Sequence, residues 1–417
     1  TDEGLPPVQV IEELAEDARD GLLNSANARF YGWVIGGALP AAIGAEWLTA
    51  AWDQNAAAYA CSPSAAIIEE VVAEWLKDIL GLPPQASSAF VTGCQMAHVT
   101  ALAAARHKVL SDRGWSAETQ GLAGSPPIRV LVGEHHETLL RALRLLGIGS
   151  DAVVQVTLKN DGTIDTDALK AELEAHPGAP TIVSLAAGDL NRGAFDPIDT
   201  VCELAHAHKA WVHIDGAFGL WAASSPRYRH LVKGISKADS WATDAHKWLN
   251  VPYDSGIVFV ADPEAHKAAM TIPAAYKIEL EQTRDQIDWG PEWSRRARGI
   301  PLYAALRSLG RNGVAAMIER CCDLTRDLVT RLGRLPGVEV LAEPIINQGL
   351  VRFLDPDGDH DARTDEVIEL INAGGEAWFG PTTWNGMRVM RVSLSNYRTT
   401  EQDIDRTVAA VEQALGL

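Results

Sequence analysis

The chain has 417 residues, of which 47% are hydrophobic and 22% are charged, a composition typical of a soluble globular protein long enough for two domains. Its formal net charge of −19 argues against a nucleic acid or an anionic membrane as a partner, and no apolar run approaches the ~18 residues of a membrane span. The acidic start lacks the layout of a signal peptide, and the five cysteines form neither a CxxC pair nor a metal-ligand cluster, so the sequence predicts a cytoplasmic protein without a bound metal.

The first 65 residues are predicted to form a segment that packs on another surface. Residues 8–23 have the pattern of a polar amphipathic helix, and residues 31–62 are rich in Gly, Ala and Trp with few charges. Exposing such an apolar segment to water is costly. We therefore expect residues 1–65 to pack on the main body or on the partner of a dimer.

Residues 66–300 are predicted to form a large α/β domain. Strand-like runs, among them IRVLVG, TIVSLAA, WVHID and SWATD, alternate there with helical stretches. This alternation indicates a mainly parallel sheet covered by helices on both faces. Ligands of such sheets bind at the carboxyl ends of the strands, and the polar, irregular residues 271–299 have the character of a loop beside such a site.

Residues 301–417 are predicted to form a smaller α+β domain. A long helical stretch covers residues 301–335, and strand-like segments (VEVLAE, GLVRFL and MRVMRVSLSN) follow it. Further helices are expected to begin at Thr364 and at Thr400. The sequence shows no internal repeat and no low-complexity tract.

A carboxylate and an amine stand at the ends of two predicted strands. The run WVHID ends on Asp215, and SWATDAHKW brings Lys247 to the same edge of the sheet. The small residues Gly216 and Ala217 let a flat group approach closely. This arrangement suits pyridoxal 5'-phosphate, since Lys247 would form a Schiff base with it and Asp215 would keep its pyridinium nitrogen protonated. An isolated pair of this kind is more often a structural ion pair, so the surrounding residues decide.

The turn at Gly93 is predicted to bind the phosphate. It lies between a strand end and an alanine-rich helix, where the backbone N–H groups of Gly93, Cys94 and Gln95 would form an anion site. An ordinary strand–helix turn is the alternative. No GxGxxG opens a helix and no GxxxxGK[ST] occurs, which argues against dinucleotide and nucleoside triphosphate ligands.

Four histidines flank these residues. His136 follows the strand IRVLVG, where it could stack over a flat heteroaromatic ring or simply cap a helix. His246 adjoins Lys247 and is expected near the phosphate or the Schiff base. His213 lies within WVHID and is expected to be structural, whereas His135 is expected to point away from the site.

Taken in order, these residues resemble the group II pyridoxal-phosphate-dependent decarboxylases, the family of aromatic amino acid, histidine and glutamate decarboxylases. The similarity runs through most of the chain and includes SPSAAIIEEVVAEWLKDILGLP, VTGCQMAHVTALAAAR, HETLLRA, HIDGAFG, DAHKW and SRRARG. The resemblance implies the aspartate-aminotransferase-like fold, with a mainly parallel seven-stranded sheet in the large domain. It also implies an obligate homodimer with the active site at the interface.

The resemblance assigns a role to each central residue. It implies Lys247 as the Schiff-base lysine, Asp215 on the pyridine nitrogen, Ala217 beneath the ring and His136 stacked above it. It also places Tyr276 on a mobile loop, as the acid that protonates the substrate carbon after CO2 leaves. Phe at this position is typical of the oxygen-consuming aldehyde synthases of the family, so Tyr276 favours simple decarboxylation. The alternative is that Tyr276 is an exposed loop aromatic.

Five positions depart from the family pattern and leave the substrate open. His98 and Asp244 stand where Asn is frequent, Ala187 lies near a frequent Thr, and Cys94 replaces a small residue. Glu137 stands where relatives carry Ser or Asn. Its carboxylate would repel a substrate carboxylate or favour a substrate with a second amine, or it would stabilise the start of a helix.

The sequence as a whole predicts a cytoplasmic homodimer that removes CO2 from an L-amino acid, with an aromatic side chain favoured over an acidic one. Arg391 could bind a carboxylate or form a salt bridge. Most of the thirteen Trp residues are expected to pack in cores and interfaces. Another pyridoxal-phosphate enzyme on the same fold (a lyase, aldolase, aldehyde synthase or transaminase) and a non-catalytic scaffold are the alternatives.

Overall fold

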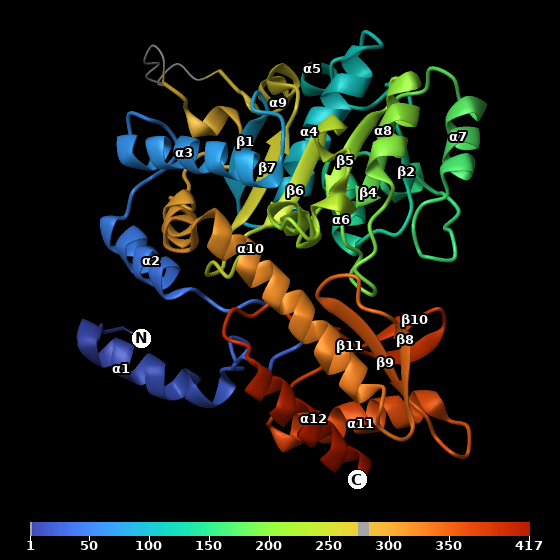
Figure 1. The fold of residues 1–417 in the computed structure, drawn as a ribbon. Helices are drawn as coiled ribbons and strands as arrows, with labels where there is room; N and C mark the ends of the chain where they lie inside the picture. Colours follow the sequence, from blue (N-terminus) through green and yellow to red (C-terminus); the bar gives the residue numbers. More distant parts are fainter. Residues whose placement is uncertain (1, 274–282) are drawn as a thin grey trace.

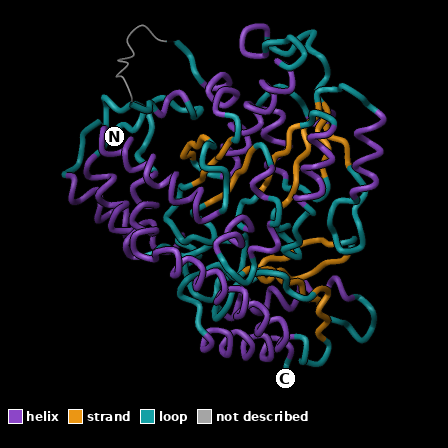
Figure 2. The backbone as a smooth tube through the Cα atoms, turned by 45° about the horizontal axis from the view of Figure 1, so that its top comes forward, coloured by secondary structure: helices purple, strands orange, loops and turns teal. Residues whose placement is uncertain are grey.

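The computed structural model describes residues 2–273 and 283–417. Figure 1 shows a large lobe built around one sheet, a small lobe around a second sheet, and a long helix that runs from one lobe to the other. In Figure 2 helices lie on both sides of the large-lobe strands. No helix among the described residues is long and apolar enough to cross a membrane.

The large sheet has seven strands in the order β1-β7-β6-β5-β4-β2-β3. Strands β6, β5, β4, β2 and β3 are parallel, whereas β7 pairs antiparallel with both β6 and β1, so the predicted mainly parallel sheet is confirmed. The strands are β1 (Ser87–Val91), β2 (Arg129–Val132), β3 (Val153–Gln155), β4 (Thr181–Ala186), β5 (Trp211–Asp215), β6 (Ser240–Asp244) and β7 (Gly256–Val260).

Two apolar layers cover this sheet, one on each face. Side chains alternate along a strand, so half of the strand residues pack in one apolar layer and the other half pack in the layer on the opposite face. A different group of helices covers each layer. The first group is α4 (Cys94–Ser111), α5 (Ala117–Gln120), α6 (Glu137–Leu145) and α9 (Pro263–Met270). The second includes α3 (Pro63–Leu80), α7 (Thr166–Ala175) and α8 (Ile198–Ala207).

The small lobe contains an antiparallel sheet in the order β10-β11-β9-β8. The long helix α10 (Gly299–Leu332) leads into it and carries one break in helical geometry at Gly310, whose φ of 62° suits glycine. The remaining elements are β8 (Val338–Ala342), β9 (Gln348–Phe353), α11 (His360–Gly374), β10 (Gly380–Trp384), β11 (Met387–Ser393) and α12 (Glu401–Leu415). Short 3-10 helices cover Arg19–Gly21, Ser150–Ala152, Gly219–Ser224, Arg229–Val232, Ile235–Lys237 and Gln286–Asp288.

The N-terminal segment leaves apolar surface exposed. Helix α1 (Pro7–Ala18) has no buried residue and projects from the body of the molecule in Figure 1. Helix α2 (Pro40–Trp52) packs on α10 but exposes Trp47 and Trp52, whose exposed fractions are 73% and 51%. Exposed apolar side chains that gather in one segment are typical of an interaction surface.

Candidate active site

A cavity of about 410 Å³ opens where the carboxyl ends of β4, β5 and β6 meet the N-terminus of α4. Its wall also includes Arg391 from β11 of the small lobe and Trp33 from the N-terminal segment. This is the edge of the sheet at which the sequence predicted ligand binding. The predicted site residues that line it are Gly93, Cys94, Gln95, His136, Asp215, Ala217, Asp244, His246 and Lys247.

Three other predictions about this region have different outcomes. Tyr276 lies outside the residues that the structure describes. His135 was expected to point away, but it lines the same cavity as His136, so that expectation is wrong. Glu137 is exposed in the first turn of α6 and is not among the described residues that line the cavity, which fits its alternative role at the start of a helix.

The amine of Lys247 is held at the cavity wall by a carboxylate. Its Nζ lies 3.2 Å from Oδ2 of Asp244, at the end of β6. Burial lowers the pKa of the Lys247 amine, but Asp244 and the other acidic groups around it outweigh burial and raise that pKa above its ordinary value. The amine is therefore a cation that faces the cavity.

The predicted anion site at the start of α4 requires two glycines. A Cβ at Gly93 would lie 3.0 Å from Cε1 of His246, and a Cβ at Gly256 would lie 2.4 Å from the Cα of Gly93. Strand β7 and the turn before α4 are therefore in backbone contact, and only the absence of side chains permits it. The turn at the N-terminus of α4 lines the cavity, and there the Cys94 N–H donates to Oδ1 of Asp244.

His246 adds a donor to this anion site. Its Nδ1 accepts the backbone N–H of Ser255 at 3.0 Å, so the neutral ring carries its hydrogen on Nε2. Burial lowers the pKa of His246 and favours that neutral form. Its Nε2 lies 3.4 Å from Oδ1 of Asp244, beside the helix terminus. A phosphate at this position would meet both the N–H groups of α4 and the Nε2–H of His246.

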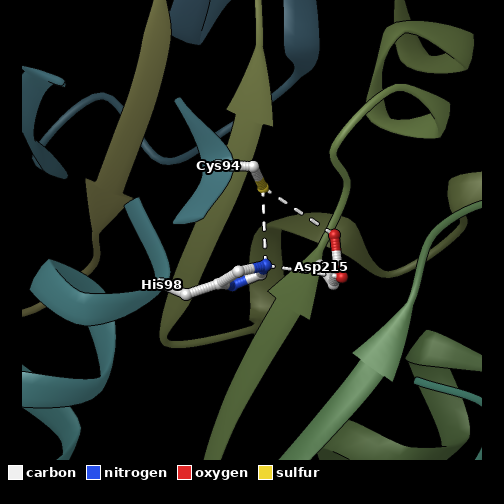
Figure 3. A group of neighbouring side chains, drawn as sticks. All are labelled: Cys94, His98 and Asp215. Carbon is white, nitrogen blue, oxygen red and sulfur yellow. Dashed lines mark hydrogen bonds and ion pairs between the residues drawn. The ribbon is translucent and has the colours of Figure 1, made fainter. Parts of the chain in front are cut away.

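Asp215, the last residue of β5, is held as a carboxylate. Its Oδ1 accepts the N–H of Ala217 at 3.1 Å and lies 3.9 Å from the thiol of Cys94, and its Oδ2 lies 3.4 Å from Nε2 of His98 (Figure 3). Burial alone would raise the pKa of Asp215, but His98, Lys247 and the Ala217 N–H lower it far below its ordinary value. A carboxylate that stays ionised suits a protonated ring nitrogen.

His136 caps α6 and lines the cavity at the same time. Its Nδ1 accepts the N–H of Thr138 at 3.2 Å and lies 2.9 Å from the hydroxyl of the same residue. Burial lowers the pKa of His136, so the neutral ring carries its hydrogen on Nε2. The capping alternative from the sequence is therefore confirmed, and the cap fixes a ring that lines the cavity, whereas stacking over a cofactor ring stays a prediction.

Charged groups that the sequence did not single out lie on the side of the small lobe. Glu134 and Asp189 line the cavity together with Arg391. Burial lowers the pKa of Arg391 to about 10, and its Nε and Nη2 have no hydrogen-bond partner among the described residues. Burial and the nearby Asp189 raise the pKa of Glu134. An arginine with free N–H groups is suited to bind a carboxylate.

Cys94, His98 and Asp215 also place three ligand atoms within 4.8 Å of one another, close enough to share a metal ion. In the observed arrangement, however, the thiol donates to the carboxylate. Burial, together with Asp215 and Asp244, raises the pKa of Cys94 well above its ordinary value, so the thiolate that a metal prefers is disfavoured.

The residues present fit pyridoxal 5'-phosphate. The N-terminus of α4 and His246 match its phosphate, the Lys247 amine matches its aldehyde, and ionised Asp215 matches its ring nitrogen. Fold and site together define a pyridoxal-phosphate-dependent enzyme. Residues 4–354 match the family described as the pyridoxal-dependent decarboxylase conserved domain, and the chain belongs to this family. It is therefore a pyridoxal-phosphate-dependent carboxy-lyase of amino acids.

Individual relatives are distant and differ in substrate. The chain is 28% identical to L-2,4-diaminobutyrate decarboxylase of Rhizobium meliloti, over 89% of this chain and 74% of that protein. It is 25% identical to the aromatic-L-amino-acid decarboxylase of Bacillus atrophaeus, over 96% of this chain and 84% of that protein. Two solved structures share the fold. Oryza sativa TDC with PLP and tryptamine has a TM-score of 0.92 at 21% identity, covering 100% of this chain and 89% of that one. Mouse CSAD has a TM-score of 0.89 at 23% identity, covering 99% and 88%.

Proposed function

We propose that this site removes the α-carboxylate of an L-amino acid and that an aromatic side chain is favoured. The observation that carries the proposal is the cavity itself, in which the cationic amine of Lys247 and the ionised carboxylate of Asp215 stand at the ends of neighbouring strands. Pyridoxal phosphate, when bound there, supplies the electron sink for the electron pair that the departing CO2 leaves behind.

Each residue has a distinct task in this proposal. Lys247 Nζ holds the cofactor covalently, and Asp215 holds a proton at its ring nitrogen. The N–H groups at Gly93, Cys94 and Gln95 bind the phosphate. His246 and Asp244 lie beside these N–H groups and set the charge next to the phosphate. His136 and Ala217 enclose the ring from two sides, which excludes water from the reacting carbon.

Tyr276 is our proposed source of the proton that returns to the α-carbon. A phenol at that point can act as a general acid. The proposal for Tyr276 rests on the resemblance of the chain to its family, since the residue lies outside the described part of the structure. Its test is given in the Discussion.

The cavity supports two classes of substrate. Trp33 and Phe218 line it and support an aromatic side chain. Glu134 supports a second candidate, a side chain that ends in an amine, because its carboxylate lines the cavity and the relative from Rhizobium meliloti is named for such a substrate. In either case Arg391 is placed to receive a substrate carboxylate.

We further propose a homodimer with the active site at its interface. The apolar surface of α1 and the exposed Trp47 and Trp52 support this assembly, because such a surface needs a partner. The five free cysteines support a cytoplasmic location. Light scattering would give the mass of the assembly, and charged substitutions at Trp47 and Trp52 are expected to shift it toward the monomer.

The first experiment is a panel of L-amino acids, including aromatic amino acids and L-2,4-diaminobutyrate, incubated with the cofactor-loaded protein while CO2 and amine are measured. Equal amounts of CO2 and amine from one substrate class would identify it. A Lys247→Ala variant should release no CO2 and retain no cofactor mass after borohydride reduction. Bound cofactor without CO2 from any amino acid would contradict the proposal and favour cleavage of another bond.

A further inference from the structure

Two of the residues that depart from the family pattern meet at one carboxylate. Cys94 and His98 lie one turn apart on α4, and both side chains point at Asp215 (Figure 3). Nε2 of His98 lies 3.4 Å from Oδ2 of Asp215 and 3.5 Å from the sulfur of Cys94. His98 is completely buried, so this contact is shielded from water.

A chain of hydrogen bonds extends from the far side of the His98 ring into the core. Nδ1 of His98 lies 2.8 Å from Nε2 of His213, and Nδ1 of His213 lies 2.9 Å from the hydroxyl oxygen of Ser240. That oxygen accepts the indole N–H of Trp211 at 2.9 Å. His213, Ser240 and Trp211 are buried as well.

When both imidazoles are neutral, the two ends of this chain fix the direction of every hydrogen bond in it. Trp211 can only donate and ionised Asp215 can only accept. The links between them are the hydrogen bonds Trp211 to Ser240, Ser240 to His213 and His213 to His98, and the 3.4 Å contact of His98 with Asp215. Each needs one hydrogen, and the indole, the hydroxyl and the two neutral imidazoles supply one each. An added proton would leave one hydrogen without an acceptor in the chain.

We propose that His98 is a positioning residue for Asp215, with its hydrogen held on Nε2 by the His213–Ser240–Trp211 chain. The fixed N–H donates to Asp215 and keeps its carboxylate ionised and aimed at the ring nitrogen of the cofactor. This inference rests on the proposed role of Asp215. A side-chain amide at position 98 could replace His98 as the donor to Asp215. It has no second ring nitrogen to accept a hydrogen bond from His213, so it could not complete the chain.

The first test uses the unmodified holoenzyme with 15N-labelled histidine. Long-range NMR correlations distinguish protonated from unprotonated ring nitrogens. We expect His98 and His213 each to carry one hydrogen, on Nε2. A hydrogen on Nδ1 of His98, whether Nε2 is bare or also protonated, would overturn the proposal.

The second test measures how well the protein distinguishes pyridoxal phosphate from its 1-deaza analogue, in which a C–H replaces the ring nitrogen. The readout is the ratio of the two dissociation constants, so a loss of packing that weakens both ligands equally leaves it unchanged. His98→Leu should lower this preference about tenfold, the typical effect of one hydrogen bond to a charged group. His98→Asn, which keeps a donor, should retain part of it.

His266→Leu is the matched control. His266 is another fully buried histidine, it bonds to Ser87 and Trp289, and it does not line the cavity. Its substitution should leave the ratio unchanged. If Asp215→Asn lowers the ratio and His98→Leu does not, the inference about His98 fails alone. If Asp215→Asn also leaves the ratio unchanged, the proposed role of Asp215 fails, and the inference fails with it.

Discussion

The backbone N–H of Cys94 donates a hydrogen bond of 2.6 Å to Oδ1 of Asp244. The helix terminus that would bind the cofactor phosphate therefore already contacts a carboxylate of the protein. The same carboxylate lies 3.2 Å from the amine of Lys247 through its other oxygen. Asp244 thus contacts both the N-terminus of α4 and the Lys247 amine, the two groups that the cofactor needs. Its carboxylate has a charge of the same sign as the phosphate.

Asp244→Asn should strengthen cofactor binding. The amide still accepts the Cys94 N–H but no longer repels the phosphate, so the dissociation constant for pyridoxal phosphate is expected to fall about threefold to tenfold. The pKa of the Lys247 amine should fall as well, because its nearest anion is lost. Absorbance titration of the apoenzyme measures the first effect. Asp199→Asn, a surface variant, serves as the control, and unchanged or weaker binding in Asp244→Asn would contradict the prediction.

Arg391→Met should raise stability while it impairs activity. Arg391 is half-buried and its Nε and Nη2 have no hydrogen-bond partner among the described residues, which costs free energy, so its removal is expected to stabilise the apoenzyme by about 1–3 kcal/mol. The KM for the amino acid should rise about tenfold or more if Arg391 binds the substrate carboxylate. Thermal unfolding and steady-state kinetics measure the two effects. Arg352→Met is the contrast, because Arg352 pairs with Asp361 and its loss should destabilise.

Tyr276→Phe should change the product rather than abolish turnover. Without the phenol, one O2 and one water are expected to be consumed for each CO2 released, giving the aldehyde, ammonia and hydrogen peroxide in place of the amine. An oxygen electrode and aldehyde analysis would detect this change beside CO2 release. Continued formation of amine without oxygen consumption would show that another group supplies the proton.

Two buried histidines should make stability depend on pH. Burial lowers the pKa of His213 and of His266 to about 3, whereas both rings protonate near their ordinary value of 6.5 in the unfolded chain. Their contribution is therefore complete above pH 6.5 and is lost as the pH falls toward 3. His266→Leu should reduce the slope of unfolding free energy against pH by about 1.4 kcal/mol per unit in this window. Urea unfolding at several pH values would measure it, and an unchanged slope would refute the assignment.

The alternating strands and helices were sufficient to predict the sheet, because each element has its own periodic signal. The antiparallel direction of β7 was not predicted. It follows from the short connection between Asp244 and Gly256, which is too short to contain the helix that a parallel crossover needs. Strand order also depends on packing between distant segments, which no local pattern encodes.

The central site residues could be predicted because the ends of parallel strands meet at one edge. The buried histidines that lie behind Asp215 could not be predicted as readily, although two features of the sequence indicated them. His213 is two residues before Asp215 on β5 and therefore shares its face of the sheet. His98 is four residues after Cys94 on α4 and therefore shares its side of the helix. Only the packing of α4 on β5 shows that these faces meet.

Helix α10 joins both lobes, and its apolar residues belong to one core that reaches from α3 in the large lobe to α12 in the small lobe. Because the two lobes share this core, we expect them to unfold together, and a single heat-absorption peak in calorimetry would be the sign of it. Fragments that end near residue 300 are accordingly poor candidates for separate expression. For the same reason, we do not expect one lobe to be exchangeable with that of a relative unless the other is exchanged with it.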